Sequence, residues 1–176
     1  RRVFRRRASG RKRPNPQTVS TLALSLAEQL LRAAERHPAL AALGARLAEM
    51  KPGAAEAVPL RGVAGSVGAL ALSLLSRATA RPFAVIAPDL DRAEAWRDDL
   101  EFFLGPDRVV YLPPHDAVPW SAQVATGPVR DDRITAILRL GDPNPPIAVI
   151  PAASLSRLVP ESSLVRSRVV TLAPEL

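Results

Sequence analysis

The residues best suited to chemistry lie in a glycine-rich segment over 60–70, which reads Leu-Arg-Gly-Val-Ala-Gly-Ser-Val-Gly-Ala-Leu. The segment follows a short apolar run and opens a stretch with helical periodicity, where a phosphate-binding loop lies in nucleotide hydrolases. In such loops, glycines let backbone amides surround the phosphates of a nucleotide. The candidate nucleotide-binding residues are therefore Gly62, Gly65, Ser66 and Gly68.

The segment departs from the pattern that a working loop needs, which is Gly-x-x-x-x-Gly-Lys followed by Ser or Thr. The lysine of that pattern meets the β and γ phosphates, and the hydroxyl holds magnesium. Counted from Gly62, the second-glycine position holds Val67, the lysine position holds Gly68 and the hydroxyl position holds Ala69. All three groups are missing. We therefore predict a degenerate loop without hydrolysis, kept as a structural turn whose glycines allow a helix to pack closely on a strand.

Two other groups of polar residues have structural explanations. His115 and Asp116 are adjacent, so in a strand their side chains point to opposite faces, and neither has a candidate nucleophile nearby. Asp131 and Asp132, just before Arg133, favour the N-terminus of a helix rather than a metal site. We predict no catalytic residue, no metal ligand and no cofactor in this segment.

The elements that would position the glycine segment follow from hydrophobic periodicity. From Val58 onward, short apolar runs alternate with helical patterns, which indicates βαβ units and a parallel sheet. Strands are predicted at Val58–Arg61, Phe83–Ala87, Val109–Leu112 and Ile147–Ile150. Helices are predicted over about 66–79, 90–104 and 129–140, with Asp89 near an N-cap and Gly105 ending the second helix. The predicted fold class is α/β, with an open, mostly parallel sheet of degenerate P-loop NTPase type.

Further elements flank this domain on both sides. Two helices are predicted over about 20–36 and 38–50, after a breaker cluster of two prolines. A short helix after Ala152 and an alternating, strand-like run over 164–172 follow the last predicted strand, and Trp96 is predicted to lie in the core. The predicted organisation is a basic disordered tail at 1–17, a helical preface at 18–56, a degenerate P-loop α/β domain at 57–165, and the start of a truncated second small domain at 166–176.

The net charge of +7 comes from one end of the chain. Residues 1–13 hold eight of the 24 Lys and Arg residues and no Asp or Glu, which leaves the remainder close to neutral. A disordered solubilising tail explains this run, while nonspecific binding of nucleic-acid phosphates through it is the alternative.

Cysteine is absent, so the chain has no disulfide, no thiolate metal site and no cysteine nucleophile. This composition fits a reducing cytosol, and we predict a cytoplasmic location. No segment reaches the roughly 20 apolar residues that a membrane-spanning helix needs, so no membrane partner is expected.

Five further pieces follow the glycine segment in order. They are Val85-Ile86-Ala87-Pro88-Asp89, Leu100-Glu101-Phe102-Phe103, a Leu-Pro-Pro-His-Asp-Ala-Val-Pro-Trp phrase at 112–120, the helix pattern at 133–140, and Val149-Ile150-Pro151-Ala152-Ala153. Their order and spacing from about Val58 to Val165 resemble the N-terminal region of transcription-repair coupling factors, which is similar to component B of the excinuclease. Two phrases depart from that family: Trp120 stands where Tyr is usual, and Thr126-Gly127-Pro128 replaces a phrase such as Ser-Pro-His.

Excinuclease component B itself is a poorer match. That protein carries an intact phosphate loop and an aromatic-rich hairpin that clamps damaged DNA by stacking. Here about 17 residues separate Pro113 from Arg130, with Trp120 as their sole aromatic residue. The resemblance therefore favours the coupling factors.

The resemblance implies a non-catalytic scaffold for recruiting excinuclease component A, mainly through the second small domain. It also implies that the parent protein is an ATP-dependent DNA translocase, which uses ATP and magnesium and binds RNA polymerase and DNA through domains outside this segment. One alternative is a fragment of a superfamily-two helicase or excinuclease with residual nucleotide binding. The other is nucleic-acid binding through the basic tail.

Overall fold

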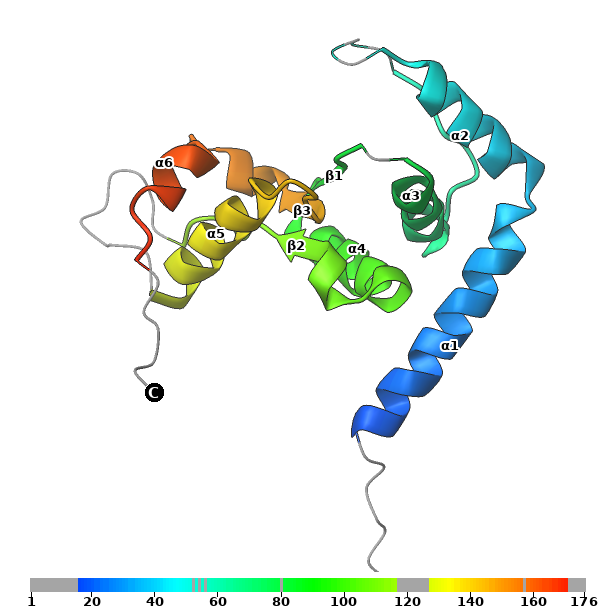
Figure 1. The fold of residues 1–176 in the computed structure, drawn as a ribbon, viewed down its shortest axis with the longest axis horizontal. Helices are drawn as coiled ribbons and strands as arrows, with labels where there is room; N and C mark the ends of the chain where they lie inside the picture. Colours follow the sequence, from blue (N-terminus) through cyan, green and yellow to red (C-terminus); the bar gives the residue numbers. More distant parts are fainter. Residues whose placement is uncertain are drawn as a thin grey trace, which may run out of the picture.

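The computed structural model describes residues 16–51, 53, 55, 57–79, 81–116, 127–156 and 158–170. Its elements (Figure 1) are α1 Pro16–Glu35, α2 Pro38–Glu49, α3 Val67–Ala78, β1 Ala84–Ala87, α4 Leu90–Leu104, the 3-10 turn η1 Pro106–Arg108, β2 Val109–Tyr111, α5 Gly127–Leu140, β3 Ile147–Pro151, the 3-10 turn η2 Ala152–Leu155, and α6 Ser162–Arg166. The predicted α/β class is confirmed. The basic run at 1–13, Trp120 and Thr126 lie outside the described residues.

The three strands form one small, open, parallel sheet in the order β1-β3-β2. Val85 of β1 pairs with Val149 of β3, and Val110 of β2 pairs with Ala148 of β3. The central strand β3 is covered on both faces, which explains its nearly continuous apolar sequence. Three of the four predicted strands and the parallel arrangement are thus confirmed.

Helices cover the two faces of the sheet as two separate hydrophobic clusters. Successive residues of a strand point to opposite faces, and Val149 accordingly packs with α1, α3 and α4, whereas Ala148 packs with Ala136 and Ile137 of α5. From α1, Ala27 and the fully buried Leu31 join the first cluster. From α2, no residue is buried. The long helix α1 is therefore packed into the same core as the sheet, and α2 lies on its outside (Figure 1).

The ends of α4 confirm the predicted boundary chemistry. Asp89 is the N-cap, and its side chain accepts a hydrogen bond of 2.7 Å from the backbone N–H of Arg92. Gly105 ends the helix with a φ of 84°, a left-handed conformation that glycine adopts without steric cost.

The first predicted strand, Val58–Arg61, was wrong. This segment pairs with no strand in the described part of the chain and is exposed, with Leu60 at 55% of its full accessibility. A short apolar run becomes a strand only when a neighbouring strand accepts its backbone hydrogen bonds, and β1, the nearest strand in sequence, pairs with β3 alone.

The elements predicted for the C-terminal part of the chain also differ from the structure. Instead of a strand over 164–172, the chain forms helix α6 and then an irregular stretch up to Val170, while residues 171–176 lie outside the described part. Val165 packs against the α5 cluster, so tertiary packing outweighs the alternation of apolar and polar residues. The predicted helix after Ala152 is the short turn η2.

Candidate functional site

The glycine segment forms an exposed turn before α3. Gly62 has a φ of 74° and Gly65 a φ of 54°, both in the left-handed region. A Cβ atom at either position would meet nothing within 4 Å. These two glycines are therefore required by backbone conformation and not by a close contact.

Gly68 has a different requirement, which comes from α4. A Cβ atom at Gly68 would lie 2.5 Å from Cη2 of Trp96, 3.0 Å from Cζ2 of the same ring, and 3.3 Å from Cγ1 of Val63. These distances are below van der Waals contact, so the Trp96 indole takes the space that a side chain at position 68 needs. Gly68 stands where a working loop has its lysine. The glycines were predicted to allow packing of a helix on a strand, whereas the close approach at Gly68 is between the helices α3 and α4.

Ser66 is tied to the same helix. It is the N-cap residue of α3 but makes no side-chain cap hydrogen bond. Its Oγ instead donates to Oδ1 of Asp99 on α4 at 2.9 Å. The Asp99 carboxylate thus lies beside the N-terminus of α3, the end of a helix that attracts anions, and its negative charge opposes the approach of a phosphate.

Trp96 and Asp99 determine the packing and the charge at the glycine turn. Of these two features, only the core position of Trp96 could be expected from sequence. Trp96 is half-buried against the main cluster, as predicted for a core residue. Its contact with Gly68 and the bond between Asp99 and Ser66 join residues 28 and 33 positions apart. No local spacing rule connects residues at such distances.

The remaining predicted polar residues are not brought to the glycine turn. His115 and Asp116 follow β2, and Asp131 lies on α5, where Oδ1 accepts from Nε of Arg130 at 3.4 Å. Because α5 begins at Gly127, Asp131 and Asp132 lie beyond its first turn, so their predicted place at a helix N-terminus was wrong. Within the described part of the chain, no group of three His, Cys, Asp or Glu residues could hold a metal ion.

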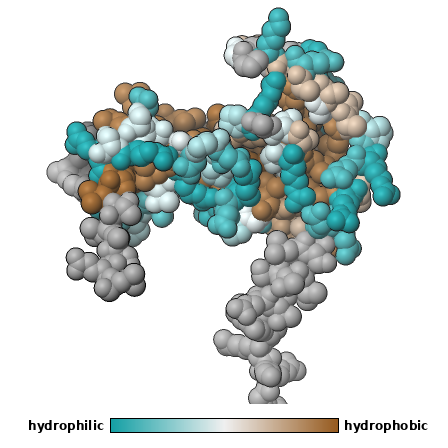
Figure 2. Space-filling model, in the orientation of Figure 1, coloured by the Kyte–Doolittle hydropathy of each residue, from teal (hydrophilic) through white to brown (hydrophobic). Residues whose placement is uncertain are grey.

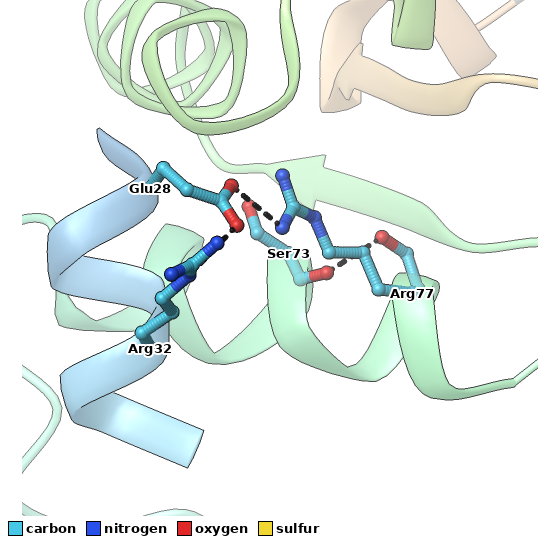
Figure 3. Close-up of polar contacts among 5 residues, drawn as sticks. Glu28, Arg32, Ser73 and Arg77 are labelled. Atoms are coloured by element: carbon cyan, nitrogen blue, oxygen red, sulfur yellow. Dashed lines mark hydrogen bonds and ion pairs between the residues drawn. The ribbon is translucent and has the colours of Figure 1, made fainter. Parts of the chain in front are cut away.

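A charged cluster fixes α1 against the C-terminal part of α3, where Arg77 lies in the last turn (Figure 3). Oε2 of Glu28 accepts from Nη1 of Arg77 at 3.1 Å, and Oε1 accepts from Nε of Arg32 at 3.4 Å. The hydrogen bond from Arg77, followed by the positive charge of Arg77, holds the pKa of Glu28 below its ordinary value. The cluster is exposed, so it specifies which faces of the two helices meet more than it adds to stability.

The fold and this turn define an α/β protein with an open parallel sheet and a glycine turn that lacks the phosphate-binding groups. The chain is 31% identical over 101 residues to the transcription-repair-coupling factor of Bacillus subtilis (strain 168). That match covers 57% of this chain and 9% of the relative, so the chain spans a small part of the relative's length. The similarity shows a distant relationship to part of that protein.

The other comparisons found no relative. No family model matches the chain, and no solved structure matches it at a significant level. Each helix in the described ranges falls short of the length and apolar character that a bilayer crossing demands.

Proposed function

We propose that this chain is a non-catalytic module of transcription-coupled DNA repair, equivalent to the N-terminal region of a coupling factor that is similar to excinuclease component B. Its role is to serve as a scaffold for recruiting excinuclease component A. The similarity to the Bacillus protein supports the DNA repair role. The observation that carries the non-catalytic assignment is the Trp96 ring against Gly68, at the position where a working loop has its lysine.

The absence of hydrolysis follows from three features of the turn acting together. No lysine offsets the charge of a triphosphate, and Ala69 provides no hydroxyl for magnesium. The one hydroxyl at the turn, on Ser66, is hydrogen-bonded to Asp99. A nucleotide would therefore meet a carboxylate where it needs a cation. In the parent protein, ATP, magnesium, RNA polymerase and DNA are assigned to domains outside this chain.

A second observation favours an interaction module. Large apolar side chains are exposed at the α5–α6 end of the molecule, where Figure 2 shows hydrophobic residues gathered on the surface. Those before residue 166 are Ile134, Leu155, Leu158, Val159 and Leu164, and Leu158 is 98% exposed. Several large apolar side chains exposed at one end of a molecule are typical of a contact with another domain or protein. We assign this end to packing against the second small domain, whose start is placed at residue 166.

Calorimetry on the 176-residue chain with ATP and magnesium tests the non-catalytic assignment. The expected result is no binding at nucleotide concentrations up to about 1 mM, which corresponds to a binding free energy of about −4 kcal/mol. A magnesium-dependent dissociation constant well below that value would contradict the proposal and favour a fragment with residual nucleotide binding.

A test of the recruitment role requires the parent protein. Deleting residues 57–170 from it is expected to abolish binding of purified excinuclease component A while ATP hydrolysis by the other domains continues. Unchanged binding of component A by the deletion variant would show that recruitment through the second small domain does not need this scaffold.

A further inference from the structure

A polar cavity of about 370 Å³ opens at the amino ends of all three strands. Phe83 precedes β1, Arg108 precedes β2 and Ile147 begins β3, and all three residues line the cavity. Because the strands are parallel, their amino ends lie at one edge of the sheet, which brings these segments together. Ser76 and Thr79, at the C-terminal end of α3, complete one wall. The cavity therefore lies at the opposite end of α3 from the glycine turn.

Two guanidinium groups line this cavity without a carboxylate among the lining residues. Arg81 donates a hydrogen bond to the backbone carbonyl of Met50, which orients it but uses only part of its five donors. Arg108 is half-buried, and within the described part of the chain no hydrogen bond or ion pair holds its side chain. Two like charges in one cavity repel each other, and an anion between them would remove that repulsion.

The other polar groups of the wall have separate roles. The hydroxyls of Ser76 and Thr79 already donate to the carbonyls of Ser73 and Leu75, at 2.9 and 2.8 Å. They can therefore only accept further hydrogen bonds. The side-chain amide of Asn144 adds neutral donors to the two guanidinium groups.

The backbone of the wall is restricted before any ligand arrives. Pro82, Pro143 and Pro145 line the cavity, and proline fixes its own φ angle. A wall with few accessible conformations loses little entropy on binding.

We propose that this cavity binds a phosphate group, clamped between Arg81 and Arg108. Guanidinium groups hold phosphate oxygens through paired, charge-assisted hydrogen bonds, which suits a small tetrahedral anion better than a single halide. The C-terminal end of α3 disfavours an anion, but the partial charge of a helix end is weaker than two full cationic charges. The site is independent of the glycine turn and of the repair role proposed above.

Nuclear magnetic resonance on the isotope-labelled 176-residue chain tests this site with inorganic phosphate alone. We expect backbone and side-chain signals of residues 81, 108 and 144 to shift together with a millimolar dissociation constant. Arg108→Gln should weaken binding roughly tenfold, because it removes one charge-assisted contact. Arg92→Gln is the matched control, since it removes the same charge from an exposed position on α4, and it should change affinity less than twofold.

Equal effects of the two substitutions would overturn the proposal, as would phosphate-induced shifts away from the cavity. A thermal unfolding curve for Arg108→Gln that matches the unsubstituted chain excludes misfolding as the cause of weaker binding. If that variant is unstable, Arg108→Lys supplies the test, because it keeps the charge but loses the paired hydrogen bonds and should still weaken binding severalfold.

The source of the phosphate is distinguished by a second titration with a short single-stranded oligonucleotide. If Arg108→Gln weakens oligonucleotide binding more than Arg92→Gln does, the ligand is a nucleic-acid backbone. If it weakens inorganic phosphate binding alone, the ligand is a free phosphate compound. No difference between the two variants with either probe overturns the site.

Discussion

Cη2 of Trp96 on α4 lies 2.5 Å from the position that a Cβ atom would take at Gly68 on α3. This contact explains why glycine occupies the place of the phosphate-binding lysine: the indole ring fills that space. A substitution at position 68 must therefore alter the packing of α3 on α4 before it can supply a phosphate-binding group. In a loop that merely lacks the lysine, a substitution would meet no such obstacle.

Gly68→Ala is expected to lower the free energy of unfolding by about 1 to 2 kcal/mol, because overpacking costs about 1–3 kcal/mol and the better helix propensity of alanine offsets part of it. Chemical denaturation measures the change. Gly127→Ala at the start of α5 is the control, since a Cβ atom there meets nothing within 4 Å. In a Trp96→Leu background the cost of Gly68→Ala should largely disappear. An equal cost in both backgrounds would contradict the packing explanation.

Ser73→Ala is expected to raise the free energy of unfolding by about 1 kcal/mol, because an unsatisfied buried polar group carries a desolvation penalty of about 1–3 kcal/mol. Ser73 is fully buried, and its Oγ has no hydrogen-bond partner within the described part of the chain (Figure 3). Replacing it with alanine removes that penalty at the expense of a small loss of packing. Thermal unfolding reports the gain. Ser76→Ala serves as comparison, because the Ser76 hydroxyl donates to the Ser73 carbonyl and its loss should not stabilise. A destabilised Ser73→Ala protein would mean that this hydroxyl is satisfied in solution.

Arg133→Ala is expected to destabilise the fold by about 2–4 kcal/mol, because truncation leaves a partly buried carbonyl without its donor and opens a cavity. Arg133 is only 4% exposed, and its Nη1 donates to the carbonyl of Pro113, which joins α5 to the segment after β2. Arg130→Ala, which removes an exposed arginine paired with Asp131, should change stability by less than about 0.5 kcal/mol. Similar losses for both variants in urea denaturation would show that the burial of Arg133 contributes nothing.

The parts of the fold that follow local rules could be predicted from sequence. Asp89 and Gly105 bound α4 through capping chemistry within a few residues, and the apolar run of β3 reflects burial on both faces. The rest depends on distant partners. Val58–Arg61 resembles a strand but has no neighbouring strand among the described residues, and Val165 resembles part of a strand but packs on α5.

The candidate site likewise has one part that could be predicted from sequence and one part that could not. The loss of the phosphate-binding groups was visible in the spacing of the glycine segment. Its replacements, the Trp96 ring at Gly68 and the Asp99 carboxylate at Ser66, come from another helix and appear only when α3 and α4 are packed together. The match between Arg77 on α3 and Glu28 on α1 is nonlocal for the same reason.

Tyr111 is expected to ionise above the ordinary tyrosine value of about 10. Partial burial raises the pKa of Tyr111 first, the negative charge of Glu94 adds to the rise, and Arg97, whose guanidinium lies 5.4 Å from the ring centre, lowers it. Since Tyr111 is the sole tyrosine, its phenolate absorbance in the near ultraviolet reports this group alone. Arg97→Gln should move the midpoint of this titration further up, and Glu94→Gln should move it down.

The pKa of Tyr111 in the folded protein lies above its pKa in the unfolded chain, so the stability linked to Tyr111 changes only as pH rises past about 10. The protonated form is favoured in the folded state, so this stability is complete below that pH and is lost as pH rises through the folded pKa. Identical midpoints in native and denatured protein would contradict this account, because denaturation removes both the burial and the neighbouring charges.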